Sequence, residues 1–196
     1  MNKTVIVDYE AGNLRSVANM LSFLDVPFEI TSKPKQILNA DRIIFPGQGH
    51  FAQAMQNLKR KGLDEVIKES CIQGIPFLGI CIGLQILFEK SEEAPNVEGL
   101  GIFKGEVKKY TIGKIPQIGW SKVVTTEVNK YIPEDYFYFV NSYYVVPKDE
   151  KIQCAMGYYH MPYCAAVQKN NITAVQFHPE KSSNAGLKFF RNWLYN

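Results

Sequence analysis

Hydrophobic and polar positions follow two alternating patterns along the first half of the chain. Short apolar runs, typical of strands buried on both faces, lie at 3–9, 27–31, 41–47 and 75–80. Between them, 13–26 and 51–70 carry apolar side chains at helical spacing, and Gly62 is a possible break in the second of these. A further helix is expected to begin at residue 83. Strands and helices that alternate in this way predict a parallel sheet with helices on both faces.

The second half of the chain consists mainly of strand-like runs. They cover 101–110, 121–126, 136–146, 152–159, 163–169 and 172–177. The KNN tripeptide at 169–171 suits a hairpin turn, and an amphipathic helix over 184–195 closes the chain. We therefore expect an α/β fold with an open mixed sheet, in which antiparallel strands extend a parallel core, within one domain covering 1–196.

Composition narrows the class of protein without defining its function. The chain has 196 residues, of which 46% are hydrophobic and 21% charged, as is ordinary for a soluble globular protein. The net charge of +3 gives no signal for nucleic acid. The apolar stretch at 75–88 is too short to span a membrane, and the N-terminus reads as a first strand rather than a signal peptide. The four cysteines form no CxxC pair and have no histidine at metal spacing, so we expect a cytoplasmic protein with reduced thiols.

One cysteine lies between two glycines, where an apolar run turns into a helix. The stretch PFLGICIGLQILF places Cys81 between Gly79 and Gly83. This arrangement is typical of a nucleophile elbow, a sharp strand-to-helix turn whose neighbours must be small. The turn exposes the sulfur at the carboxyl end of the sheet, and the start of the helix favours a thiolate. The alternative is a buried, inert cysteine, and a partner base must decide between the two.

A candidate base follows the last predicted strand. Of the three histidines, His178 directly follows the apolar run ITAVQF, and strand ends of such sheets face the active site. Glu180 lies two residues further on, with Pro179 stiffening the link. A carboxylate there could fix the tautomer and orientation of the imidazole. The sequence therefore predicts a triad of Cys81, His178 and Glu180.

The segment PGQGHFA has two competing interpretations besides a helix-capping turn. Gly47, Gly49 and Ala52 fit a loose dinucleotide-binding fingerprint. That fingerprint usually follows the first strand, however, and no acidic residue ends a strand about twenty residues later. We favour a glycine loop in which a backbone N–H at Gly47 or Gln48 supplies an oxyanion donor, together with the N–H of Ile82.

The motifs PGQG, GICIGLQ and QFHPEKS, in this order, resemble the class I, triad-type glutamine amidotransferases. Four further segments are similar to the glutaminase subunits of imidazole glycerol phosphate synthases. These segments are DYEAGNLRSV, LFEKSEEAP, PQIGW and YFYFVNSYY. The resemblance covers nearly the whole chain.

The resemblance implies a mechanism and a partner. The Cys81 thiolate would attack the carboxamide of glutamine, and His178, held by Glu180, would take and return the proton. The implied glutamine-binding residues are Gln85, Glu93, Asn141, Ser142 and Tyr143. Ammonia would pass to a (β/α)₈-barrel cyclase subunit that forms imidazole glycerol phosphate and an aminoimidazole carboxamide ribonucleotide, in histidine and purine metabolism. The positions implied to face this partner are Asn13, Ser16, Trp120, Tyr138 and Lys181. No cofactor or metal is implied.

Three positions depart from the pattern of the subunit, and other functions stay open. Gln48 stands where a small aliphatic residue is usual, and Gln117 and Asn141 stand where histidine is usual. None of them belongs to the triad, so they bear on signalling and partner identity. The main alternative is a paralogous glutaminase that supplies another acceptor, such as a sugar amidotransferase. A catalytically dead regulatory subunit and a stand-alone cysteine hydrolase or peptidase are the others.

Overall fold

The parallel half of the sheet places the carboxyl ends of its strands along one edge. The computed structural model describes residues 3–10 and 13–195, so Ala11 and Gly12 of the AGNLRSV segment lie outside it. The strands run in the order β2-β1-β3-β4-β12, and every neighbouring pair is parallel. Their bounds are β1 (Thr4–Val7), β2 (Phe28–Thr31), β3 (Arg42–Phe45), β4 (Phe77–Ile80) and β12 (Ile172–Val175). The predicted parallel core is confirmed.

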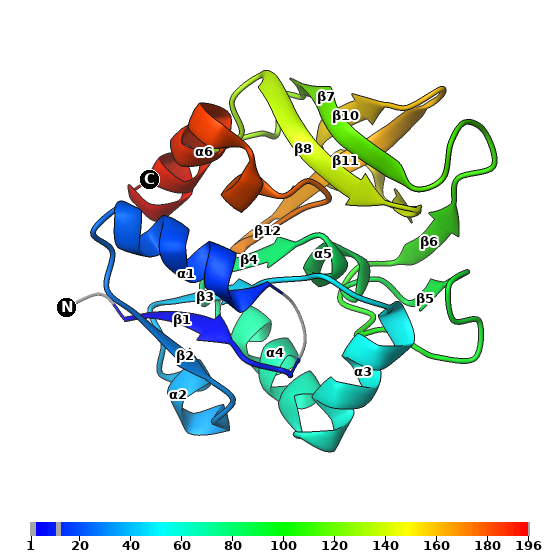
Figure 1. Ribbon diagram of the computed structural model, residues 1–196. Coiled ribbons are helices and arrows are strands. Elements are labelled where there is room, and N and C mark those ends of the chain that lie inside the picture. The colour runs from blue at the N-terminus through cyan, green and yellow to red at the C-terminus, as the bar shows by residue number, and fades with distance from the viewer. Residues whose placement is uncertain (1–2, 11–12, 196) are drawn as a thin grey trace.

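Side chains that alternate along these strands bury the two faces of the sheet under different helices (Figure 1). Val5 and Val7 of β1 pack in the cluster that contains α2 (Pro34–Leu38), α3 (Phe51–Arg60) and α4 (Leu63–Ile72). Ile6 points the other way, into the cluster that contains α1 (Leu14–Phe23) and α6 (Ser183–Tyr195). Because successive side chains of a strand face opposite sides, an unbroken apolar run is what a sheet covered on both faces requires.

Antiparallel strands extend the sheet beyond β12, as predicted. The order continues β11-β10-β7-β8, and a branch of β9, β6 and β5 leaves from β11. The short β5 pairs with β6 in parallel, unlike the rest of this extension. Their bounds are β5 (Lys90–Ser91), β6 (Gly105–Lys109), β7 (Gln117–Thr125), β8 (Asp135–Asn141), β9 (Tyr143–Pro147), β10 (Gln153–Tyr158) and β11 (Pro162–Lys169). Two 3₁₀ turns, η1 (Glu150–Ile152) and η2 (Pro179–Lys181), complete the described elements.

The helix expected from residue 83 is much shorter than its pattern predicts. The observed helix α5 (Ile82–Gln85) ends after one turn. The carbonyls of Ile86 and Leu87 would bond within a longer helix. They accept instead from the N–H groups of Leu100 (2.8 Å) and Phe103 (2.9 Å). A loop distant in the sequence therefore ends this helix, which no local pattern could indicate.

Other elements also differ from the sequence expectation, among them β5, which was not predicted, and β7, which begins at Gln117 rather than at residue 121. The short helix α2 was not predicted, although Pro34 occupies its first turn, where proline is well tolerated. The run 136–146 is two strands, β8 and β9, separated at Ser142.

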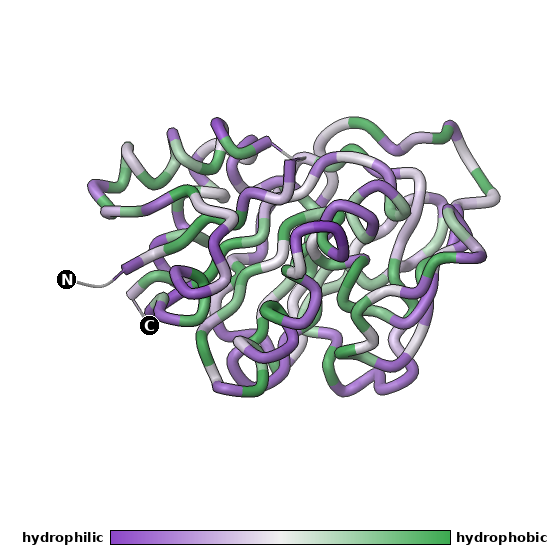
Figure 2. Tube along the Cα trace, turned by 90° about the horizontal axis from the view of Figure 1, so that it is seen from below, coloured by the Kyte–Doolittle hydropathy of each residue, from purple (hydrophilic) through white to green (hydrophobic). Residues whose placement is uncertain are grey.

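The hydropathy trace shows apolar positions through the centre of the molecule and hydrophilic positions recurring on its outer turns (Figure 2). Within the described residues, the helices are all too short or too polar to cross a bilayer.

Candidate active site

Cys81 occupies a strained turn between β4 and α5. Its backbone has φ 54° and ψ −103°, and a left-handed φ of this kind costs a residue with a Cβ about 1–3 kcal/mol. Its N–H donates to the carbonyl of Val175 in β12 over 2.7 Å, which holds the turn against the neighbouring strand. The elbow (residues 79–83) thus has the strand–turn–helix geometry expected from its sequence. Since α5 has only one turn, its dipole contributes less than a full helix would.

The glycines of the elbow are explained by close approach. A Cβ built on Gly79 would lie 2.5 Å from the carbonyl oxygen of Gly83. A Cβ built on Gly83 would lie 2.6 Å from the carbonyl oxygen of Phe45 in β3. Both distances are far below van der Waals contact, so no larger residue fits at either position without moving the backbone.

His178 and Glu180 form a buried pair just after β12. The Nδ1 atom of His178 lies 2.8 Å from Oε1 of Glu180, and the two side chains are 0% and 2% exposed. Burial acts to lower the pKa of His178. The neighbouring charge of Cys81 and the hydrogen-bonded Glu180 carboxylate outweigh burial and raise that pKa to about 10. Among the described residues, Nε2 of His178 has no hydrogen-bond partner, so it is the ring atom left for proton transfer.

One cavity of about 240 Å³ collects the predicted glutamine-binding residues. It is smaller than the roughly 300–1,000 Å³ pockets that hold drug-sized ligands, and its size suits an amino acid. Its lining includes Gln48, Cys81, Ile82, Gln85, Glu93, Asn141, Ser142 and Tyr143, all of which the sequence analysis singled out. Gly49, Pro116 and Val140 complete the lining.

Glu93 links this cavity to the start of α3. Its Oε2 accepts a hydrogen bond of 2.7 Å from the N–H of Phe51, the first residue of α3. The carboxylate therefore caps a helix N-terminus, where a negative charge is stabilised. Burial raises the pKa of Tyr143, and the negative charge of Glu93 raises it further. An ammonium group in the cavity would meet a carboxylate that is already held in place.

The glycine loop after β3 packs directly against the elbow. A Cβ on Gly47 would lie 2.3 Å from Cγ2 of Ile82 and 2.4 Å from the carbonyl oxygen of Ile80. Gln48 is exposed and lines the cavity. Ile82 is the first residue of α5, and the first N–H groups of a helix have no acceptor within it. Gly47 therefore lies against the elbow, and the oxyanion role of the N–H groups of Gly47, Gln48 and Ile82 stays a prediction.

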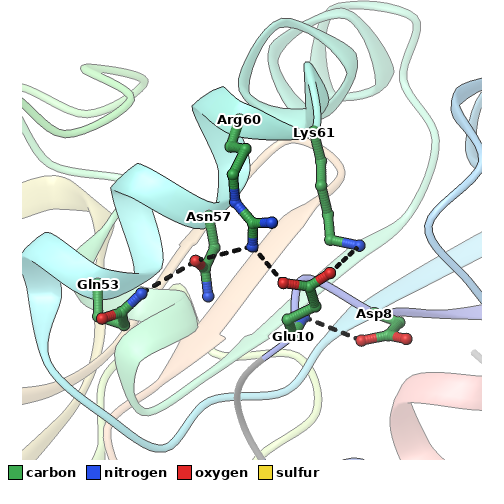
Figure 3. Close-up of polar contacts among 6 residues, drawn as sticks. All are labelled: Asp8, Glu10, Gln53, Asn57, Arg60 and Lys61. Atoms are coloured by element: carbon green, nitrogen blue, oxygen red, sulfur yellow. Dashed lines mark hydrogen bonds and ion pairs between the residues drawn. The ribbon is translucent and has the colours of Figure 1, made fainter.

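A polar network ties α3 to the loop after β1 (Figure 3). Glu10 pairs with Arg60 and, over 3.0 Å, with Lys61, and these hydrogen bonds lower the pKa of its carboxyl group. Arg60 also donates to Asn57, which accepts from Gln53 as well. Exposed ion pairs of this kind add little stability, and none of these residues lines the cavity.

The five positions predicted to face a partner lie on two neighbouring surfaces. Ser16 and Lys181 line a groove of about 440 Å³ between α1 and α6, and Glu180 reaches the same groove. Asn13 caps α1 by accepting from the N–H of Ser16 over 3.3 Å. Trp120 and Tyr138 are paired across β7 and β8, with ring centroids 6.0 Å apart.

The backbone of β8 connects one of these surfaces to the predicted base. The carbonyl of Tyr138 accepts from the N–H of His178 over 2.9 Å. The N–H of Tyr138 donates to Oγ of Ser182, which in turn donates to the carbonyl of His178. A displacement of β8 would therefore move the backbone of His178.

Two of the positions that depart from the subunit pattern are cross-strand partners. Gln117 in β7 lies opposite Asn141 in β8, and both side chains are buried. The hydroxyl of Tyr110 lies between them. It donates to Gln117 over 3.3 Å and accepts from Asn141 over 3.4 Å. The two amides therefore share one polar layer, and Asn141 also lines the cavity.

Two residues near the sulfur escaped the sequence analysis. Gln176 is fully buried and places its Nε2 3.5 Å from Sγ of Cys81. Tyr9 is fully buried too, and the charge of Cys81 adds to the burial that raises its pKa. For Gln176, a glutamine within an apolar strand and two residues before the predicted base was a signal that could have been used. Nothing in the sequence indicates that Tyr9 lies near Cys81. Tyr9 follows β1 and Cys81 follows β4, and β3 lies between these strands in the sheet.

A larger cavity, of about 480 Å³, lies away from this chemistry. It is lined by the end of α4 and the start of β12, and so lies at the opposite edge of the sheet. Its one thiol, Cys71, has a pKa raised to about 12 by burial, which leaves it inert as a nucleophile.

Comparisons with known proteins agree with the sequence resemblance. The sequence model of the family described as Glutamine amidotransferase class-I matches residues 5–196. The HisH subunit of imidazole glycerol phosphate synthase from Dehalococcoides mccartyi is 45% identical, over 96% of this chain and 95% of the relative. The same subunit from Moorella thermoacetica is 43% identical, over 98% and 94%.

Solved structures that resemble this chain share its fold. A glutamine amidotransferase crystal structure matches with a TM-score of 0.79 at 17% identity, covering 97% of this chain and 96% of the other. The structure of PurLQS from Thermotoga maritima matches with a TM-score of 0.77 at 17% identity, covering 98% and 97%. The predicted fold class is confirmed. The chain belongs to the class-I glutamine amidotransferases and, within them, to the HisH subunits of imidazole glycerol phosphate synthase.

Proposed function

We propose that the chain hydrolyses glutamine to glutamate and ammonia through Cys81, His178 and Glu180, acting as one domain. The observation that carries this proposal is the strained elbow that presents Cys81 at the amino-acid-sized cavity, next to the buried His178–Glu180 pair. A nucleophile, a base and a carboxylate that orients the base are the parts that acyl transfer needs.

The first half-reaction forms a thioester. The Cys81 sulfur attacks the side-chain carboxamide carbon of glutamine, and the carbonyl oxygen becomes negatively charged. The N–H of Ile82 and a backbone N–H of the Gly47–Gln48 segment stabilise this oxyanion. Nε2 of His178 gives its proton to the departing nitrogen, which leaves as ammonia. Glu180 holds the imidazole through Nδ1, so that Nε2 faces the reaction.

The second half-reaction restores the enzyme. A water molecule attacks the thioester carbon, and Nε2 of His178 takes its proton. The carbon–sulfur bond breaks, glutamate is released and the Cys81 thiolate is regenerated. Throughout, Glu93 binds the ammonium end of the substrate and Gln85 binds the reacting amide, and the 141–143 segment lines the same cavity.

We further propose that ammonia passes to a (β/α)₈-barrel cyclase subunit, within the cytoplasm. The names of the relatives, which are subunits of imidazole glycerol phosphate synthase, support a partner. So does the outer face of β7 and β8, where Ile118 is 61%, Trp120 51% and Tyr136 55% exposed. Large apolar side chains that gather on one exposed face are typical of a surface that a partner covers.

The test is conversion of glutamine to glutamate by this chain alone, with the cyclase from the same organism, and with cyclase plus its nucleotide acceptor. We expect stimulation by cyclase and acceptor, and loss of all turnover in Cys81→Ala. Trp120→Ala should weaken stimulation without lowering the melting temperature, because its ring is half exposed. Ile72→Ala, at an exposed site of the opposite edge, is the matched control.

Other outcomes identify the alternatives. A folded chain that neither binds the cyclase nor responds to it would contradict the proposed partner, and a different ammonia acceptor would then be sought. Turnover of peptides or simple amides by the chain alone would favour a stand-alone hydrolase. No turnover under any condition would favour a regulatory subunit.

A further inference from the structure

Gln176 joins the elbow to the cavity through its carboxamide. It follows β12 directly and lies two residues before His178. Its side chain is 0% exposed. Its N–H donates to the carbonyl of Ala165 in β11 over 2.8 Å, so its backbone is held by the sheet. A polar side chain buried to this degree is costly unless both ends of its amide are used.

Both ends of this amide contact residues of the site. Nε2 lies 3.5 Å from Sγ of Cys81, and Oε1 accepts a hydrogen bond of 3.0 Å from Nε2 of Gln85. The orientation of the amide follows from the second bond. Because Gln85 offers an N–H, the oxygen of Gln176 must face Gln85, and its NH₂ group must face the sulfur.

The same contacts orient Gln85. Its NH₂ group donates to Gln176 and also, over 3.4 Å, to the carbonyl of Tyr143. Both of its N–H bonds are therefore used within the protein. The carbonyl oxygen of Gln85 is the atom left for a ligand, and it can accept from the carboxamide N–H of a substrate.

An N–H donor aimed at sulfur favours the thiolate over the thiol. A hydrogen bond to the charged form of an acid stabilises that form. A neutral amide achieves this without adding a charge that would compete with protonated His178. Among the described residues, His178 and Tyr9 are titratable groups that interact with Cys81.

We propose that Gln176 is a positioning residue, whose single carboxamide stabilises and orients the Cys81 thiolate and fixes the Gln85 amide toward the substrate. The purpose of this residue rests on the proposed glutaminase function, whereas its placement rests on its contacts with Cys81 and Gln85. It acts through Cys81 and Gln85, and does not itself contact the substrate.

The test reads the thiolate directly. The rate of Cys81 alkylation by iodoacetamide is measured against pH, with Cys81→Ala as the blank for the three other cysteines. In Gln176→Met, which keeps the length of the side chain and removes both hydrogen bonds, we expect the midpoint of the profile to rise by about one pH unit. Gln176→Glu should raise it as well, because a carboxylate then faces the sulfur.

A matched control separates this effect from general damage. Gln168 is also buried in the sheet, and its side chain accepts from the N–H of Lys130 over 3.0 Å, away from Cys81. Gln168→Met should lower stability and leave the alkylation midpoint unchanged. For glutamine hydrolysis, Gln176→Met should raise KM more than Gln176→Glu, which keeps the acceptor for Gln85.

An unchanged midpoint in folded Gln176→Met or Gln176→Glu would overturn the inference. A measurement on the wild-type chain decides the matter if neither variant folds: the side-chain amide NMR signal of Gln176 should shift with pH at the alkylation midpoint, and should stay constant in Cys81→Ala. A constant signal in the wild type would refute the contact. Alkylation needs neither glutamine nor a partner, so failure of this inference is distinguishable from failure of the proposed function.

Discussion

Substitution of Gly83 by alanine sets helix propensity against packing. Gly83 lies inside α5, where alanine would be favoured over glycine by about 1 kcal/mol if propensity alone mattered. The added Cβ would lie 2.6 Å from the carbonyl oxygen and 3.0 Å from Cδ1 of Phe45. Phe45 is fully buried in β3 and stacks on Tyr9 at 4.4 Å, so neither atom can move freely.

Packing should outweigh propensity. To reach ordinary contact at 3.4 Å, the elbow and β3 must part by roughly 0.8 Å. Overpacking of this kind typically costs about 1–3 kcal/mol, and backbone contacts lie at the upper end. After the gain in propensity, we expect a net destabilisation of about 2 kcal/mol, or a melting temperature lower by roughly 4–8 °C. A shift approaching 1 Å at Cys81 should reduce glutamine turnover by about 100-fold.

The assay combines urea unfolding with glutaminase turnover in the presence of the cyclase and acceptor. Gly74→Ala is the control. It also loses stability, because Gly74 has φ +81°, but its Cβ meets no atom within 4 Å and it lies away from the elbow. The control should therefore be destabilised and fully active. Wild-type stability and turnover in Gly83→Ala would refute the close approach between the elbow and β3.

Two further predictions concern buried groups at the site. The pKa of His178 is raised from 6.5 to about 10, so the stability contributed by its protonated form should be fully present below pH 6.5 and be lost as the pH rises to about 10. Urea unfolding across this range should show a smaller loss in Cys81→Ala, which lacks the neighbouring charge, and equal losses would contradict this cause. Within the described residues, the buried hydroxyl of Tyr9 has no hydrogen-bond partner, so Tyr9→Phe should leave stability unchanged or raise it by about 1 kcal/mol. A lower melting temperature for Tyr9→Phe in a thermal scan would argue that the hydroxyl is hydrogen-bonded.

Sequence patterns predicted the architecture well where local and global requirements agree. The unbroken apolar runs at β1, β3, β4 and β12 indicated strands buried on both faces, and they form the parallel core. The pattern was wrong after residue 85, where a helix was expected to continue. The carbonyls of Ile86 and Leu87 are taken by Leu100 and Phe103, and such distant hydrogen bonds leave no periodic trace in the sequence.

Part of the candidate site could likewise be predicted from the sequence, and part of it is visible only in the tertiary structure. Gly79, Cys81 and Gly83 lie within five residues, and His178 and Glu180 lie within three, so spacing alone determined the elbow and the histidine–carboxylate pair. The pairing of Gln176 with Cys81 and Gln85, and of Glu93 with the N–H of Phe51, joins segments that are far apart along the chain. Only the parallel register of β4 with β12 and the packing of α3 bring these groups together, because contacts between distant segments depend on how the whole sheet is assembled.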